Sequence, residues 1–217
     1  MHNYTLSIFL NHSIILAAIL SLIRYNLIKR SYYPFIFLIW LGLVNESISL
    51  LLAYSTGNNA LNSNVFVVLE YFTILYQFYK WNAGDGGRKY FVLACLGVMI
   101  WITDNFIINA ITQNNSLFRA CSSFTIVFLT VRQLSKIIVF RRGILLKNAM
   151  FIICITFLFY FSCKAFVESL NAFHLGLSRG VLWNLWVMLY FVNFISNLIY
   201  AIAVLCIPMK HKFISQY

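Results

Sequence analysis

Long apolar stretches alternate with short polar connections along the whole chain. A helix needs about 20 mostly apolar residues to cross the hydrocarbon core of a bilayer, and seven stretches approach that length. We therefore expect seven membrane-spanning helices, with ends placed to within about 2–4 residues. The predicted spans are 7–27, 34–54, 64–81, 90–112, 117–138, 148–168 and 181–207.

The composition agrees with a membrane protein made of one domain. Hydrophobic residues make up 62% and charged residues 10% of the 217-residue chain, whereas about 25% of the residues of a soluble domain are charged. No internal repeat or low-complexity linker divides the spans. The sequence therefore predicts an all-α, polytopic bundle of seven transmembrane helices that forms a single transmembrane domain over residues 1–217.

The basic residues predict the orientation of this bundle. Of the 16 Lys and Arg residues, 13 fall in connections or span ends on one side, Arg119 and Arg179 fall on the other, and Lys164 lies inside the sixth span. Cytoplasmic loops of membrane proteins carry the excess of Lys and Arg. We therefore expect an outside amino terminus and a cytoplasmic carboxyl terminus, which requires an odd number of spans. The net charge of +11 is thus a signal of topology and predicts the lipid bilayer, not nucleic acid, as a partner.

Three carboxylates lie inside the predicted spans, in a chain that has only 5 acidic residues. An ionisable group at the middle of a span costs at least ~2.5 kcal/mol, so such groups normally face the bundle interior or a pathway. At 1.5 Å per helical residue, Glu46, Glu70 and Asp104 all lie roughly 9–12 Å below the outer face. Lys164 lies one turn inside the outer end of the sixth span. Because the carboxylates outnumber this lysine, the cluster suits binding of a cation or of a protonatable ligand.

Other polar and aromatic residues share the outer half of the predicted bundle, whereas the inner half is mostly Leu, Ile, Phe and Val. A polar seam that opens outward is therefore expected. Helical spacing places Trp183, Trp186 and Tyr190 on one face of the seventh span. The predicted ligand-binding residues are Glu46, Glu70, Trp101, Asp104, Asn105, Lys164, Trp183 and Asn184. In the alternative interpretation, the carboxyl groups are structural and either pair with Lys164 or are buried in the neutral form.

The sequence excludes several known classes of membrane protein. The seventh span has no lysine, so it cannot form the Schiff base of a retinal protein. Only His12 among the histidines is expected in the membrane, which excludes the seven-helix zinc hydrolases, and the catalytic motifs G-x-S-x-G and H-E-x-x-H are absent. We expect no metal and no cofactor. The 5 cysteines have no ligand spacing, and only a Cys121–Cys163 disulfide is left open.

Two segments, WLGLVNESISLLL and NVFVVLEYFTILYQFYKW, carry a resemblance to a known group. They are similar to small, uncharacterised bacterial multi-pass membrane proteins, which implies an integral protein of the bacterial cytoplasmic (inner) membrane but no activity. The first hypothesis for function is a receptor- or transporter-like protein that binds a small ligand or cation in the outward-facing seam. The alternatives are a membrane-embedded enzyme that uses the intramembrane carboxylates, although no nucleophile can be assigned, and an accessory subunit that needs a membrane protein partner.

Overall fold

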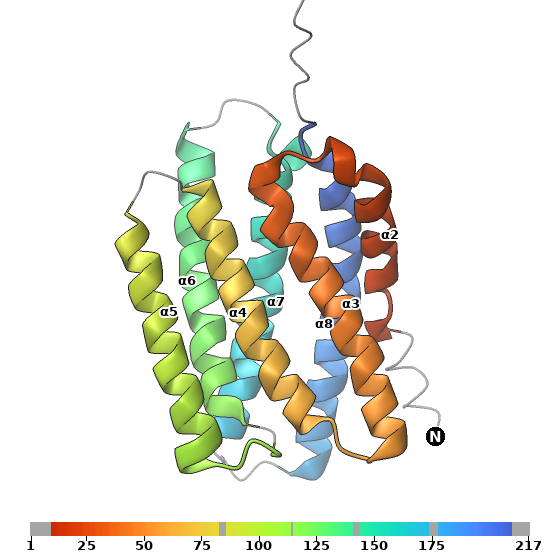
Figure 1. The fold of residues 1–217 in the computed structure, drawn as a ribbon, viewed down its shortest axis with the longest axis vertical. Helices are drawn as coiled ribbons and strands as arrows, with labels where there is room; N and C mark the ends of the chain where they lie inside the picture. The colour runs from red at the N-terminus through yellow and green to blue at the C-terminus, as the bar shows by residue number, and fades with distance from the viewer. Residues whose placement is uncertain (1–9, 83–85, 114, 141–143, 174–177, 210–217) are drawn as a thin grey trace, which may run out of the picture.

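The structure is a computed structural model that describes residues 10–82, 86–113, 115–140, 144–173 and 178–209. Seven helices run up and down through these residues (Figure 1). They are α2 (Ile14–Arg24), α3 (Tyr33–Ser55), α4 (Ala60–Trp81), α5 (Gly87–Ile102), α6 (Ser116–Phe140), α7 (Ala149–Ala172) and α8 (Arg179–Cys206). The predicted all-α bundle of seven helices is confirmed.

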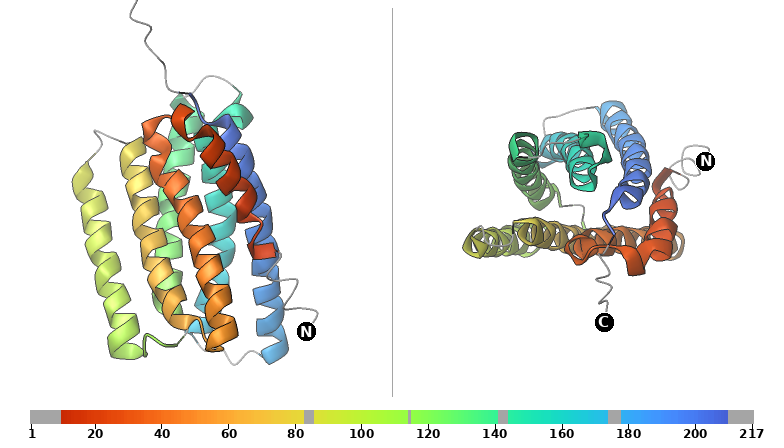
Figure 2. Two further views of the ribbon diagram at one scale, coloured as in Figure 1. Left: turned by 45° about the vertical axis from the view of Figure 1, so that its right-hand side comes forward. Right: turned by 90° about the horizontal axis from the view of Figure 1, so that it is seen from above.

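The helices form two layers. Seen from above, α5, α4, α3 and α2 make one row, and α6, α7 and α8 make the other (Figure 2). Contacts of α2 with α8 and of α4 and α5 with α6 join the two rows, so α5 lies at one edge of the bundle. We call the end where α3 meets α4, α5 meets α6 and α7 meets α8 the lower end, as it is drawn in Figure 1. The opposite end is the upper end.

Five of the helical segments are long and apolar enough to cross a membrane by themselves. These are Arg30–Ser55, Gly87–Ile108, Ser116–Phe140, Ala149–Ala172 and Gly180–Cys206. Helix α4 is as long as these but carries Asn62, Asn64, Glu70, Gln77 and Lys80, which lower its hydropathy. Helix α2 is short and continues as a 3-10 turn, η1 (Tyr25–Leu27). Both helices run alongside the other five (Figure 1), so the protein is a helical membrane protein.

Several predicted helix ends are wrong by about one turn. Helix α4 begins at Ala60 instead of residue 64, because the Asn58 side chain accepts the N–H of Ala60 at 2.9 Å. Helix α5 ends in a π-helical turn, η3 (Thr103–Ile108), before residue 112. Helix α7 continues to Ala172 beyond the predicted end at 168. The predicted start of the first span at residue 7 lies outside the described residues.

The upper half of the bundle is packed with aromatic rings between the layers. Phe35, Phe78 and Phe157 are at most 1% exposed. The centroid of the Phe157 ring lies 6.3 Å from that of Phe78, 5.9 Å from that of Phe161 and 6.0 Å from that of Tyr200. All three pairs have the edge-to-face geometry that aromatic pairs prefer. This cluster closes the upper half of the interior.

Candidate functional site

A buried ion pair joins the two layers in the lower half of the bundle. The Nζ atom of Lys164 in α7 lies 2.7 Å from Oε2 of Glu70 in α4, and both side chains are at most 10% exposed. The ring centroids of Tyr160 and Phe161 lie 5.5 and 5.4 Å from the same Nζ atom, within the range of a cation–π interaction. The predicted pairing of Lys164 with an intramembrane carboxylate is therefore present, and its partner is Glu70.

A second ion pair lies nearby and was not predicted. Nη1 of Arg119 in α6 is 3.7 Å from Oε1 of Glu168 in α7, and the two side chains are 9% and 2% exposed. Nη2 of Arg119 also donates to Ser63 Oγ at 2.9 Å and to Asn64 Oδ1 at 2.8 Å in α4. Arg119 thus connects three helices. Its Nε atom and the Oε2 atom of Glu168 are buried without a hydrogen-bond partner among the described residues.

The sequence analysis counted Arg119 on the outer side of the bundle and assigned it no partner, and it placed Glu168 at the end of the sixth span. The placement of Glu168 is wrong. Helix α7 extends to Ala172, so Glu168 lies inside it. Residues four apart share a helix face, and Glu168 is four residues after Lys164. That spacing is the signal that indicates an inward-facing Glu168.

A cavity of about 430 Å³ lies at the lower end of the bundle. Glu46 and Arg119 contribute charge to its wall, and Trp183, Trp186 and Tyr190 of α8 contribute aromatic rings. The complete lining is Asn11, His12, Asn45, Glu46, Ser49, Leu50, Ala53, Asn59, Ser63, Arg119, Trp183, Trp186 and Tyr190. Cavities of about 300–1,000 Å³ with a few polar groups among apolar and aromatic residues are typical of small-molecule sites. We call this space the lower cavity.

A smaller cavity of about 80 Å³ lies between the lower cavity and the ion pair, and it shares lining residues with the lower cavity. Asn11 and Glu46 line both spaces, and Glu70 lines the smaller one. Its other wall is α8, where Asn193 Nδ2 donates to Asn11 Oδ1 at 3.2 Å and Asn197 lines the same space. Glu46 therefore lies at the junction of a polar path that runs from the lower end of the bundle to the Glu70–Lys164 pair.

Asp104 does not belong to this path. Its Oδ2 atom accepts the backbone N–H of Phe118 at 2.8 Å, and its Oδ1 atom accepts a hydrogen bond from Asn109 Nδ2 at 3.0 Å. Phe118 is the third residue of α6, and the first N–H groups of a helix have no partner within the helix. A carboxylate is favourable at that position. Asp104, which is fully buried, thus holds the start of α6 and is not among the residues that line either cavity.

Of the remaining predicted site residues, some line a cavity and others do not. Trp183 lines the lower cavity, whereas Asn184 is exposed and lines neither space. Asn105 Oδ1 accepts from Asn115 Nδ2 at 2.9 Å within the α5–α6 connection. Trp101 Nε1 donates to the carbonyl oxygen of Asn64 at 3.0 Å. The structure thus brings Glu46, Glu70, Lys164 and Trp183 to one polar region, leaves Trp101, Asp104 and Asn105 in structural contacts, and leaves Asn184 exposed.

Metal-binding and redox groups do not gather at this site. Within the described part of the chain, no group of three or more His, Cys, Asp and Glu side chains is arranged to hold a metal ion. Cys121 and Cys163 are both free thiols, so the disulfide that the sequence left open is not formed. The chemistry of the site is that of charges, amides and aromatic rings.

No protein-family model, curated protein or solved structure matches the chain. The resemblance to small bacterial multi-pass proteins therefore stays a prediction. The fold and the site define a helical membrane protein with a polar cavity at one end of the bundle.

Proposed function

We propose that this protein binds a small ligand or cation in the lower cavity and acts as a receptor- or transporter-like membrane protein. The observation that carries the proposal is the position of Glu46 at the junction of the two cavities. Within the described residues no salt bridge joins Glu46 to a lysine or arginine; Asn11 hydrogen-bonds to its carboxylate, and its titratable neighbour is His12. A carboxylate removed from water without a lysine or arginine to pair its charge is costly, so a cation that enters the cavity gains a favourable contact.

The other intramembrane carboxylates differ from Glu46 because each already has a partner within the protein. Glu70 is neutralised by Lys164 and Glu168 by Arg119, and Asp104 accepts two hydrogen bonds. Glu46 is therefore the carboxylate whose charge is left for a ligand.

The aromatic wall favours an organic cation. Trp183, Trp186 and Tyr190 line the same cavity as Glu46, and a carboxylate with aromatic faces is a common set for recognising amines and quaternary ammonium groups. The lower cavity has room for such a molecule. The smaller cavity of about 80 Å³ has room for about two waters, since a water occupies roughly 30 Å³ of liquid.

The closed upper half favours sensing over transport. Transport requires a second path to the opposite face, and the rings of Phe78, Phe157 and Phe161 fill the space where such a path would run. Binding and sensing require only the lower opening. We propose that such a receptor passes its signal to a membrane protein partner.

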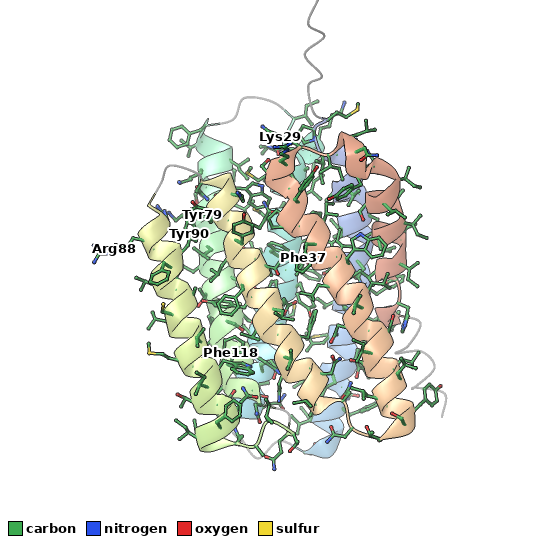
Figure 3. The ribbon with its side chains drawn as sticks, viewed as in Figure 1. Lys29, Phe37, Tyr79, Arg88, Tyr90 and Phe118 are labelled. Atoms are coloured by element: carbon green, nitrogen blue, oxygen red, sulfur yellow. The ribbon has the colours of Figure 1, made fainter. Side chains whose placement is uncertain are left out.

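The orientation that we propose places the lower end outside and the upper end in the cytoplasm, in the inner membrane of a bacterium. The support is the distribution of Lys and Arg, and Figure 3 shows Lys29 and Arg88 toward the upper end of the bundle. An impermeant maleimide should label Asn59→Cys but not Gly86→Cys in intact spheroplasts that carry an otherwise cysteine-free chain. Labelling of Gly86→Cys alone would reverse the orientation.

A thermal-shift screen tests the binding proposal. The purified protein in detergent is heated with a panel of amines, quaternary ammonium compounds and monovalent and divalent metal ions. A ligand at a hundred times its dissociation constant stabilises the folded protein by about 2.7 kcal/mol, so a clear rise in Tm is expected for at least one compound.

Two variants decide whether the effect belongs to the site. Glu46→Gln should remove the rise in Tm, whereas Asp85→Asn, which removes a carboxylate from the connection between α4 and α5, should keep it. An equal rise in Glu46→Gln and in the wild type, or no stabilising compound at all, would contradict the proposed site. The accessory-subunit hypothesis would then be preferred.

A further inference from the structure

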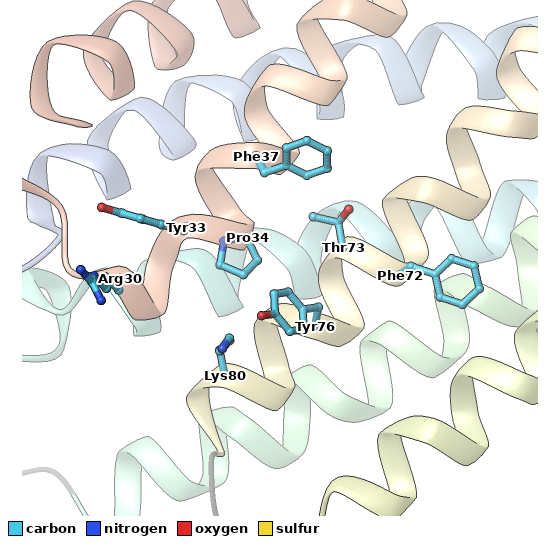
Figure 4. Close-up of a pocket in the computed structure, with 8 residues that line it drawn as sticks. All are labelled: Arg30, Tyr33, Pro34, Phe37, Phe72, Thr73, Tyr76 and Lys80. Atoms are coloured by element: carbon cyan, nitrogen blue, oxygen red, sulfur yellow. The ribbon is translucent and has the colours of Figure 1, made fainter. Parts of the chain in front are cut away.

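A third hollow, of about 570 Å³, lies between α3 and α4 near the upper end of the bundle (Figure 4). It lies in the four-helix layer and shares no lining residue with the two cavities described above. Its lining is Arg30, Tyr33, Pro34, Phe37, Phe72, Thr73, Tyr76 and Lys80. We call it the α3–α4 groove.

The groove exists because small residues lie between larger ones. Pro34 and Thr73 occupy its middle (Figure 4), where neither side chain is long enough to bridge the two helices. Phe37 and Tyr76 are 58% and 49% exposed, so the groove opens on the outer surface of the bundle. In a membrane protein, that surface faces lipid.

The two ends of the groove differ in chemistry. Arg30 and Lys80, both exposed, lie at one end, and Phe37 and Phe72 lie at the other (Figure 4). Phe37 follows Arg30 by seven residues and Phe72 precedes Lys80 by eight, which separates the two ends by roughly 10–12 Å at 1.5 Å per helical residue. The basic end is nearer the end of the bundle, and the aromatic end lies deeper along the helices.

The basic end is also built to hold its charge in place. The Nζ atom of Lys80 lies 5.0 Å from the centroid of the Tyr76 ring, a cation–π distance that keeps the ammonium group at the mouth of the groove. None of the lining residues is acidic, so the two cations have no carboxylate in the groove.

We infer that the α3–α4 groove binds one anionic phospholipid from the membrane leaflet at the upper end. The phosphate lies beside Arg30 and Lys80, and an acyl chain runs along Phe37 and Phe72. This arrangement matches an amphiphile whose charge is at the membrane surface and whose chain points into the bilayer. Each Lys or Arg near an anionic headgroup contributes about fivefold in affinity, which favours anionic over zwitterionic lipid.

Lipid binding to the full-length protein in detergent tests the inference by native mass spectrometry. Phosphatidylglycerol and phosphatidylcholine with the same acyl chains are titrated separately. The wild type should retain one phosphatidylglycerol more tightly than phosphatidylcholine. The double variant Arg30→Gln/Lys80→Gln should weaken binding of phosphatidylglycerol by roughly 30-fold, the loss expected for two interfacial cations, and should leave phosphatidylcholine unchanged.

A matched charge variant separates the groove from general attraction to the membrane surface. Arg88→Gln/Lys89→Gln removes the same charge from the start of α5, at the same end of the bundle but outside the groove. It should retain phosphatidylglycerol as the wild type does. An equal loss in both double variants would overturn the inference, because the attraction would then be diffuse.

A third variant tests the groove itself without a change in charge. Thr73→Trp fills the middle of the groove and should displace the phospholipid, while the circular dichroism of the protein stays helical. Glycerol phosphate, which has the headgroup charge but no chain, should not compete at millimolar concentration. Undiminished phosphatidylglycerol binding in Thr73→Trp, or competition by glycerol phosphate, would each overturn the inference.

Discussion

The lower and upper halves of this bundle are built by the same helices, but their interiors are filled by different kinds of side chain. The lower half holds two ion pairs, a set of amide contacts and two cavities that share the lining residues Asn11 and Glu46. The upper half is filled by rings, with Phe35, Phe78 and Phe157 almost completely buried. Helix α7 shows the change within a single element, from Phe157 to Lys164 over two turns.

The difference indicates that the lower half is shaped for something other than stability. A buried ion pair is weak evidence for stability, because apolar residues of similar volume often do as well or better. Empty volume also forfeits packing contacts. A bundle selected only for stability would continue the aromatic packing of the upper half downward. The polar lower half is therefore where function is expected, and substitutions in both halves test this comparison.

The largest effect is expected for Lys164→Met. Removal of the ammonium group leaves the carboxylate of Glu70 buried without its partner, which costs about 3–5 kcal/mol. Unfolding in mixed micelles of dodecyl maltoside and sodium dodecyl sulfate measures the loss. The exposed Lys80 supplies the matched control, and Lys80→Met should leave the free energy of unfolding nearly unchanged.

A double variant shows whether the cost comes from the unpaired charge. Glu70→Gln/Lys164→Met removes both charges and should recover most of the stability that Lys164→Met loses, since replacing both members of a buried pair is often neutral. If Lys164→Met and Lys80→Met are equally mild, the ion pair is not a structural element and the comparison between the halves fails.

The second effect is expected in the upper half, for Phe157→Ala. This side chain contacts three aromatic neighbours, and its loss leaves a cavity. We expect a cost of about 2 kcal/mol, below the usual 3–5 for water-soluble cores, because Phe157 meets lipid in the unfolded state as well. The control is Phe159→Ala in the same helix, where the side chain is 43% exposed and little change is expected. A cost for Phe157→Ala no greater than for Phe159→Ala would show that the upper half is not closely packed.

The sequence predicts the helices and the vertical position of polar groups because both depend on local hydropathy. It does not predict which helices are neighbours. Glu46, Glu70 and Asp104 have similar calculated depths, yet α5 lies at the edge of its row (Figure 2). Asp104 therefore meets the start of α6 and not the other two carboxylates. The lateral order of helices is set by packing between distant segments, which hydropathy does not encode.

Arg119 shows a second limit of the sequence. It is close to the beginning of α6, where a long basic side chain usually extends toward water. In the structure the guanidinium group instead turns inward to Ser63, Asn64 and Glu168. Only the partners supplied by α4 and α7 make that direction favourable, and neither is near Arg119 in the sequence.

The smallest effects are expected for two side chains that accept a backbone N–H at the start of a helix, one at each end of the bundle. Gln77 Oε1 accepts the N–H of Phe35, the third residue of α3, at 2.8 Å, as Asp104 accepts the N–H of Phe118 in α6. Loss of a side chain that caps a helix costs about 1 kcal/mol. Gln77→Ala and Asp104→Ala should therefore destabilise the protein by similar amounts in the same micelle assay.

Asp104→Asn makes the most specific test of how the lower half is divided. Asparagine keeps an acceptor for the N–H of Phe118 but loses the acceptor for Asn109 Nδ2. It also loses the attraction between a charge and the start of α6, which is worth about 0.3–1 kcal/mol. The rise in Tm caused by a cation should remain in this variant, because Asp104 lines neither cavity. If Asp104→Asn removes that rise as Glu46→Gln does, all three carboxylates act as one site. The division of the lower half into a binding region around Glu46 and a scaffold around Asp104 would then be wrong.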